Sequence, residues 1–237
     1  SDAAGLDNGS SWQNAFTSLQ DALTVAVRNN EIWVAAGTYK PTTGTDRNAS
    51  FHLRSDLAVY GGFNGTETLL SQRDWQTNIT ILSGDLNNDD AVTGTGESLS
   101  IANNNENSYH VIHNSGVNSG AILDGFIIQG GNADNNTNGG GIWNESSSPG
   151  IANCIFTGNQ AYNGGAIYNI TSSPVITGCT LNENIGNNEG GGISNNSSSP
   201  QITNCTFSGN KSAGSGGGIY NNYNSSPVLL KCTIEKN

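Results

Sequence analysis

The feature that most constrains the fold is a repeat of about 26 residues in the C-terminal half of the chain. In each copy a proline precedes a short apolar run and a cysteine, and two or more glycines precede an isoleucine. The cysteines, 25, 26 and 27 residues apart, are Cys154, Cys179, Cys205 and Cys232; the isoleucines, 25, 26 and 26 residues apart, are Ile142, Ile167, Ile193 and Ile219. Repeats of this length are typical of solenoids, in which each unit buries its apolar side by stacking on its neighbours.

The short alternating runs within a repeat leave no room for a helix. In residues 174–181, Ile176, Cys179 and Leu181 can all face inward if the chain bends between 176 and 179. The residues at that bend in the four repeats are Asn153, Gly178, Asn204 and Lys231. Because asparagine and glycine tolerate positive φ, the pattern predicts a left-handed kink between two strands, with Lys231 as the exception.

Two further bends are predicted at recurring asparagines, which can form ladders from coil to coil. One series is Asn159, Asn184, Asn210 and Asn237, and the other is Asn144, Asn169, Asn195 and Asn221. Three strands and three bends per repeat predict an all-β, right-handed parallel β-helix with coils roughly 4.8 Å apart. Columns of isoleucine, of cysteine, and of Phe156, Leu181, Phe207 and Ile234 would fill its core.

Two phrases of the repeat, FTGN at 156–159 and GGAI at 164–167, resemble the repeats of the polymorphic outer-membrane adhesins. Upstream stretches resemble secreted bacterial right-handed β-helix repeat proteins of the pectin-lyase-like fold: IWVAAGTY (32–39), YGGFNGTE (60–67), ILSGDL (81–86) and LDGFIIQGG (123–131). The resemblance covers nearly the whole chain and implies the same fold. It implies less about function, because β-helices carry lyases, hydrolases, adhesins and structural stalks.

The charge of the chain narrows its partners. With 19 acidic and 8 basic residues, its formal net charge is −11, which disfavours a nucleic acid or an anionic lipid surface as partner. No apolar run approaches membrane-spanning length, so no membrane insertion is expected. A missing signal peptide and initiating methionine predict a mature or excised fragment. With the resemblance, this composition predicts a secreted or cell-surface bacterial protein.

Three regions are predicted along the chain. Residues 1–30 form an N-terminal cap, residues 31–131 irregular coils with insertions, and residues 132–237 the regular coils. In the cap, a capping box of Ser10 and Gln13 is expected to start an amphipathic helix over residues 12–29, which covers the mouth of the β-helix.

The regular coils are expected to present variable loops along one edge and to end in an incomplete coil. The loops are segments 132–138, 160–163, 185–189 and 211–215. The chain stops at Asn237 without a glycine–isoleucine segment, so a continuation of the natural chain, or a partner packed on that end, is expected.

The four cysteines allow two interpretations. In a secreted chain they could form two disulfides. Because their spacing equals the repeat, they could instead form a column of buried free thiols, whose parallel side chains make the disulfide dihedral hard to reach. The second interpretation is favoured.

A calcium site is predicted in the acidic, amide-rich insertion 84–108. Asp85, Asn87 and Asp89 alternate as in the opening of an EF-hand loop, and Asp90 adds another hard oxygen ligand of the kind that calcium prefers. The following glycine and the distant bidentate glutamate of that motif are missing. The alternative is a solvated loop.

A strip of aromatic side chains is the second candidate site. Trp143, Tyr168 and Tyr220 each follow a repeat isoleucine, with Ser194 at the equivalent position of the third repeat, so they are expected to face outward. Stacked outward rings could bind sugars. Packing between coils, for the stability of the sheet, is the alternative.

These observations favour an extracellular or cell-surface β-helix module with a structural or adhesive role, whose partner is a polysaccharide or a host or neighbouring cell surface. An enzyme is less favoured: residues 141–237 carry four acids, none at a shared repeat position, and no arginine or histidine. The alternatives are a polysaccharide lyase or hydrolase, and a filament in which copies of the chain stack head to tail.

Overall fold

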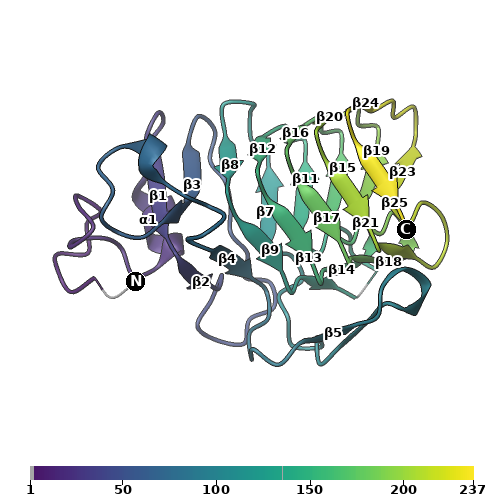
Figure 1. The fold of residues 1–237 in the computed structure, drawn as a ribbon, viewed down its shortest axis with the longest axis horizontal. Coiled ribbons are helices and arrows are strands. Elements are labelled where there is room, and N and C mark those ends of the chain that lie inside the picture. Colours follow the sequence, from purple (N-terminus) through teal and green to yellow (C-terminus); the bar gives the residue numbers. More distant parts are fainter. Residues whose placement is uncertain (1–2, 135) are drawn as a thin grey trace.

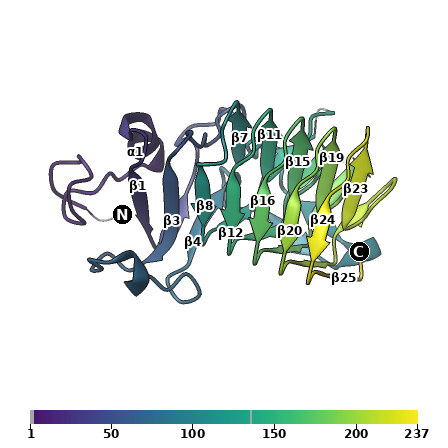
Figure 2. The same ribbon diagram turned by 90° about the horizontal axis from the view of Figure 1, so that it is seen from above.

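The computed structural model describes residues 3–134 and 136–237, which form a parallel β-helix with its coils stacked along one axis (Figures 1 and 2). The predicted fold class is confirmed, with about 27 residues per turn, little helix and an N-terminal helix. No helix within these residues is long and apolar enough to span a membrane. Residues 1 and 2 of the predicted cap and residue 135 of the predicted loop 132–138 lie outside the described residues.

Four parallel sheets run along the axis, and each regular coil adds one strand to each of them in turn. Sheet 1 consists of β1 (Glu31–Ala35), β3 (Ala58–Phe63), β8 (Ile122–Asp124), β12 (Gly150–Ala152), β16 (Val175–Thr177), β20 (Gln201–Thr203) and β24 (Val228–Leu230). Sheet 2 consists of β2 (Gly37–Tyr39), β4 (Thr80–Ser83), β9 (Ile127–Gln129), β13 (Ile155–Thr157), β17 (Thr180–Asn182), β21 (Thr206–Ser208) and β25 (Thr233–Glu235). Sheet 3 consists of β10 (Asn132–Ala133), β14 (Gln160–Asn163), β18 (Ile185–Glu189) and β22 (Lys211–Ser212). Sheet 4 consists of β7 (Ile112–Ser115), β11 (Ile142–Glu145), β15 (Ile167–Ile170), β19 (Ile193–Asn196) and β23 (Ile219–Asn222).

Sheet 3 was not expected from the sequence. Its strands fall in the variable segments, such as 160–163 and 185–189, where loops were predicted, so each regular coil has four strands rather than three. These segments are polar and lack an apolar alternation, but a parallel strand pairs through its backbone with the coil before and the coil after it. Their inward positions are small, as at Ala161 and Gly186, which is why no apolar stripe marks them.

Each corner of a coil is made by a residue with positive φ. In the coil that contains β12 to β15 these are Asn153 (50°), Gly158 (63°), Gly164 (66°) and Thr171 (51°). The first corner lies where it was predicted, and Lys231 adopts it too, at 53°. At Gly164 a Cβ would lie 2.3 Å from the carbonyl oxygen of Ile167, so only glycine fits this corner.

The predicted core columns are confirmed. The repeat isoleucines pair in register along sheet 4, and Phe156, Leu181, Phe207 and Ile234 pair along sheet 2. Phe156, Leu181 and Phe207 are fully buried. Stacking therefore gives each coil the apolar contacts that it cannot make alone.

The asparagines form two buried ladders, as predicted. The left-handed bends fall on nearby residues instead, for example on Gly158 beside Asn159. In sheet 4, Asn144 donates to Asn169 and Asn169 donates to Asn195, both at 2.9 Å. At the corner between sheets 2 and 3, Asn159 donates to Asn184 (3.0 Å) and Asn184 to Asn210 (2.9 Å). Each amide thus forms a hydrogen bond with the asparagine of the next coil. An unpartnered polar group would be costly inside the core.

Serines form a further ladder that the sequence did not predict. The backbone N–H of Ser147 donates to the Ser172 hydroxyl at 2.8 Å, that of Ser172 to Ser198 at 2.9 Å, and that of Ser198 to Ser225 at 3.0 Å. The serine run before each proline is therefore part of the coil-to-coil hydrogen bonding.

All four cysteines are free, as favoured from their spacing, and Cys154, Cys179 and Cys205 are buried. The backbone N–H of Cys179 lies 3.4 Å from the Cys205 sulfur. Hydrogen bonding from Cys179 lowers the pKa of the Cys205 thiol to about 7 despite burial, whereas the pKa of Cys179 is raised well above its ordinary value.

The N-terminal helix is shorter than predicted. Helix α1 spans Leu19–Val25, and Ser18 caps it through its hydroxyl, which accepts from the Asp21 N–H at 3.3 Å. The predicted start was wrong because Gly5 donates from its N–H to the Gln13 carbonyl, which closes the preceding segment into a loop. Within α1, Leu19 and Leu23 belong to the core.

The insertion after β4 folds into an antiparallel hairpin, β5 (Ala91–Thr93) and β6 (Ser100–Ala102), with the short helix η2 (Gly96–Ser98) between them. The connection between β3 and β4 carries η1 (Leu70–Gln72). In Figure 1 the hairpin lies along one side of the coils, below β13 and β14. Its Leu99 is only 2% exposed, so the hairpin is packed rather than free.

We predict that Asn169→Ala will destabilise the protein strongly. The substitution leaves the Nδ2 of Asn144 and the Oδ1 of Asn195 without their ladder partners in the core. At about 1–3 kcal/mol for each buried unpartnered group, the free energy of unfolding should fall by about 2–5 kcal/mol in denaturant titrations. Asn105→Ala, the same change at an exposed position, should alter it by less than about 0.5 kcal/mol. Equal losses in both variants would contradict a stabilising ladder.

A thiol titration tests the cysteine column. In the native protein Cys232, which is only partly buried, should react first with a thiol reagent, while the three buried thiols react only on unfolding. All four should be modified under denaturing, non-reducing conditions. Fewer than four modified thiols there would indicate a disulfide and contradict the structure.

Candidate functional site

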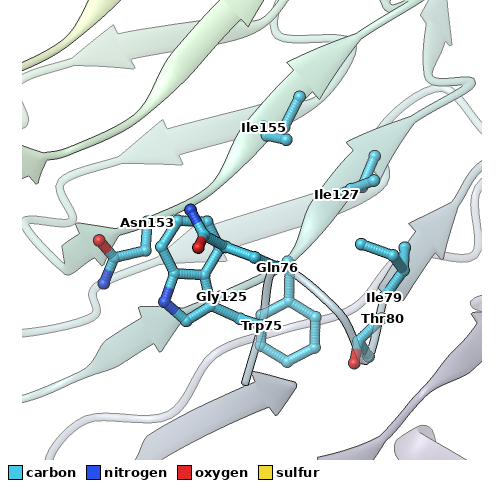
Figure 3. Close-up of a pocket in the computed structure, with 9 residues that line it drawn as sticks. Trp75, Gln76, Ile79, Thr80, Gly125, Ile127, Asn153 and Ile155 are labelled. Carbon is cyan, nitrogen blue, oxygen red and sulfur yellow. The ribbon is translucent and has the colours of Figure 1, made fainter. Parts of the chain in front are cut away.

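A pocket of about 200 Å³ lies on the outer face of sheet 2, beneath the segment that connects β3 to β4 (Figure 3). Its lining consists of Trp75, Ile79, Thr80, Gly125, Phe126, Ile127 and Ile155, with the amides of Gln76 and Asn153. Figure 3 shows Ile127 and Ile155 on neighbouring strands, with Trp75 and Gln76 contributed by the connecting segment. The pocket therefore combines an aromatic ring, an apolar floor and two hydrogen-bonding amides.

A buried ion pair fixes the segment that carries Trp75. The Arg73 guanidinium lies 2.7 Å from the Asp124 carboxylate, and the two side chains are 12% and 15% exposed. Arg73 also donates to the carbonyls of Gly61 and Asp124, both at 3.1 Å, and Asp124 accepts from Asn153 Nδ2 at 2.9 Å. Asp124 thus joins one side of the pocket to the other, and its charge is paired and hydrogen-bonded.

Close backbone packing places Trp75. A Cβ at Gly62, where φ is 94°, would lie 2.6 Å from the Trp75 Cα. The glycine lets the connecting segment lie directly on β3. The start of the segment is held by Glu67; burial opposes its charge, but hydrogen bonds from the backbone N–H groups of Asn64, Glu67, Thr66 and Gly65 outweigh this and hold its pKa below the ordinary value.

A second, larger hollow of about 610 Å³ lies further along sheet 2. Ile155 lines both spaces. The remaining lining is mostly polar: Thr95, Thr180, Asn182, Glu183, Ser208, Gly209, Glu235 and Lys236. We call the two spaces together the sheet 2 groove.

The hairpin forms the side of this groove. Gly96 donates from its N–H to the Gly209 carbonyl at 3.0 Å, and the Lys211 ammonium donates to the Leu99 carbonyl at 3.2 Å. Nearer its base, Asn104 donates to the Gln160 side chain at 2.9 Å. These contacts hold the hairpin lengthwise across several coils.

The predicted aromatic strip is in register but is not fully presented to solvent. Trp143, Tyr168, Ser194 and Tyr220 occupy one column of sheet 4. Tyr168 is only 6% exposed. Trp143 stacks on His113, with ring centroids 4.5 Å apart and planes 12° from parallel. The buried ring of Tyr168, in the middle of the column, therefore packs between coils.

Three histidines gather at the N-terminal end of this column. The His113 ring lies 5.7 Å from His110 and 5.8 Å from His52. Burial, and then the neighbouring His113, lower the pKa of His110 to about 4, although its bond to the Gly139 carbonyl opposes this. Burial also lowers the pKa of His113. At neutral pH His110 is therefore uncharged.

The predicted calcium ligands separate into two groups. Asp85 and Asp90 lie together with Glu106, which was not predicted, with one carboxylate oxygen of each within 4.8 Å of the others. Asn87 and Asp89 are exposed, and the Asp89 carboxylate is not part of this cluster. Burial, and the nearby Asp85, Glu106 and Asp89, raise the pKa of Asp90 to about 7, against the hydrogen bond from Asn107.

The sequence analysis did not predict the residues that line the groove. Trp75 and Gln76 lie in an irregular connection with no repeat to compare them with. The available signal was a tryptophan just after an arginine, in a segment whose length exceeds a turn. No sequence pattern indicated the pairing of Asp124 with Arg73.

Two segments, residues 153–170 and 204–222, match the Chlamydia polymorphic membrane protein repeat. Each begins at a positive-φ corner and runs through strands of sheets 2, 3 and 4, so the family repeat corresponds to most of one coil. The FTGN and GGAI phrases at 156–167 lie within the first match, which bears out that resemblance. No curated protein and no solved structure matched the chain, so the likeness to pectin-lyase-like proteins stays a prediction.

We predict that His110→Gln will reduce the loss of stability on acidification. Because the folded pKa of about 4 lies below the ordinary 6.5, the unfolded chain takes up the proton first. The stability from neutral His110 is complete above pH 6.5 and is lost as the pH falls towards 4, by about 3 kcal/mol in total. Glutamine carries no proton there, and its amide can still bond Gly139.

The measurement is the free energy of unfolding from pH 8 to pH 4, in the wild type and the variant. Asp90, with its raised pKa, acts in the opposite direction over part of this range, so the difference between the two proteins is the quantity to compare. Parallel curves would show that His110 titrates normally.

Proposed function

We propose that this chain is an adhesive β-helix module of the bacterial outer surface that binds an extended, mainly uncharged polysaccharide in the sheet 2 groove. The observation that carries the proposal is the pair of adjacent hollows on sheet 2, which share Ile155 and extend from the Trp75 pocket to Glu235 and Lys236. The surface location is supported by the two repeat matches, whose family name is that of a bacterial membrane protein.

The dimensions suit a chain-like ligand. From β9 to β25 the groove crosses four steps between adjacent strands of sheet 2, which at about 4.8 Å each gives roughly 19 Å. A linear polymer can lie along this axis and meet the same column in each coil. That column changes from Ile127 and Ile155 to Thr180 and Thr206, so hydroxyl groups replace apolar ones along the groove.

The chemistry of the groove suits sugars. The Trp75 ring offers an apolar face, and Gln76, Asn153 and Asn182 offer both donors and acceptors. Concave sites with an apolar floor and few fixed polar groups are typical of ligand binding. The net charge of −11 disfavours strongly anionic polymers, which is why an uncharged glycan is proposed.

The aromatic column of sheet 4 is the competing surface. Trp143 and Tyr220 are partly exposed, but the buried Tyr168 interrupts any platform between them. The sheet 2 groove is supported better because its tryptophan borders a concavity.

Binding to a panel of neutral polysaccharides tests the proposal. Trp75→Ala should weaken binding by about 2 kcal/mol, which raises the dissociation constant roughly thirtyfold, as expected for loss of an aromatic anchor. Gln76→Ala, at an exposed amide of the same pocket, should weaken it less. Unaltered thermal unfolding of both variants would show that the fold is kept.

Trp143→Ala and Tyr220→Ala are the matched controls on the other surface. Both should bind as the wild type does. If they lose binding while Trp75→Ala keeps it, the sheet 4 column is the site and the groove proposal fails. The same samples, assayed for new reducing or unsaturated ends, would reveal a lyase or hydrolase, for which Glu183 and Glu235 are the carboxylates lining the groove.

A further inference from the structure

The base of the insertion 84–108 is closed by a backbone hydrogen bond and contains three carboxylates. The N–H of Ser108 donates to the Gly84 carbonyl at 2.9 Å, where the chain returns to the coil. Asp85 and Asp90 on the outgoing segment and Glu106 on the returning one face each other here. The cluster therefore joins the two ends of the insertion that carries the hairpin.

Two of the three carboxylates have oxygens without partners. Asp90 Oδ1 and Glu106 Oε1 are buried from solvent and accept no hydrogen bond. Asp85 is 7% exposed and accepts backbone N–H bonds from Asn88 and Asp90, which fix its orientation. Buried carboxylate oxygens without a partner are costly, because they lose the water that would otherwise solvate them.

A fourth oxygen points to a ligand independently of the acids. The side chain of Asn107 is fully buried, and its Nδ2 donates to Asp90 Oδ2 at 2.8 Å, which places the amide beside the cluster. Its Oδ1 is buried and has no partner. Because a neutral amide gains nothing from protonation, a proton shared among the carboxylates would leave this acceptor without a partner, whereas a cation beside the cluster would satisfy it.

No basic side chain neutralises the cluster. Lys40 reaches this region, but its ammonium donates to the Leu86 carbonyl at 2.7 Å. Arg47 donates to the Asn107 and Asn132 carbonyls and pairs with Asp134 at 3.2 Å. Within the described part of the chain, no lysine or arginine forms an ion pair with Asp85, Asp90 or Glu106.

We propose that Asp85, Asp90 and Glu106, with Asn107 Oδ1, bind one calcium ion that fastens the base of the hairpin to the β-helix. Carboxylate and amide oxygens without nitrogen or sulfur ligands are the donors that Ca²⁺ prefers. The four side chains supply part of its usual six to eight ligands, and carbonyls and water can complete the shell. The site is independent of glycan binding.

The hairpin is the element that should respond. It is fixed at its tip by Gly96 and Lys211, whereas at its base three acidic side chains lie close together and their negative charge opposes closure. Calcium converts that repulsion into attraction, so it should slow the local opening of residues 91–102. Local opening of this kind is measured by amide hydrogen exchange.

Calorimetry of the whole chain, stripped with a chelator and titrated with calcium chloride, tests the proposal. One ion should bind per chain, and the melting temperature should rise with calcium. Asp90→Asn and Glu106→Gln should each raise the dissociation constant by roughly tenfold or more, because each removes a charged ligand. Glu97→Gln, at an exposed glutamate of the same hairpin, and Asp89→Asn, at the exposed carboxylate outside the cluster, should bind as the wild type does.

The two cluster variants also carry a check on folding. Without calcium they should melt at or above the wild-type temperature, because they relieve repulsion; with saturating calcium they should melt below it. Calcium should slow the hydrogen exchange of residues 91–102 in the wild type but not in Asp90→Asn or Glu106→Gln. Absence of binding at millimolar calcium would overturn the proposal, and so would binding that survives both cluster substitutions. A calcium effect that is lost equally in Glu97→Gln would also contradict it.

Discussion

In-register backbone pairing between successive coils is the constraint on which the rest of this structure depends. Once Ile142 pairs with Ile167, every later residue of the coil is placed above the residue 25 to 27 positions before it. A polar side chain admitted to the core must then find its partner in the adjacent coil. Asparagine meets this condition because one amide both donates and accepts, and the ladder through Asn144 and Asn169 uses both functions.

The same constraint determines where the chain can vary. An insertion is tolerated where it leaves and re-enters at a corner, so that the strands on either side keep their register. Across the insertion 84–108, Ile81 still pairs with Ile127, and Gly84 is bonded to Ser108. The insertion 84–108 and the connection between β3 and β4 therefore lie outside the coils, where they build the hairpin beside the sheet 2 groove and the Trp75 pocket. We propose that the irregular parts serve recognition, whereas the repeated parts supply the paired strands, ladders and core columns that stabilise the fold.

The sequence predicted the repeated parts of the chain better than the irregular parts. Periodic spacing located the columns, the ladders and the first corner, because each was visible several times over. Sheet 3 was missed because its inward residues, such as Ala161, are small and leave no apolar stripe. Trp75 and Glu106 were missed because their neighbours are brought close only by the folded path of single-copy segments. The cap was misplaced because Ser10 and Ser18 are both plausible starts, and only the loop closed by Gly5 and Gln13 distinguishes them.

Two buried acids of this chain show how the fold treats charge. Asp124 is paired with Arg73 and accepts from Asn153, so its burial is compensated within the protein. Asp90 receives one hydrogen bond from Asn107 and faces two further carboxylates. Oxygens of Asp90, Glu106 and Asn107 are buried there without a partner, and we propose that a calcium ion satisfies them. A calcium ion at the base of the hairpin would have a mechanical role, since it would join the outgoing and returning segments beside the backbone bond between Gly84 and Ser108 and the bond from Asn103 to the Asp89 carbonyl.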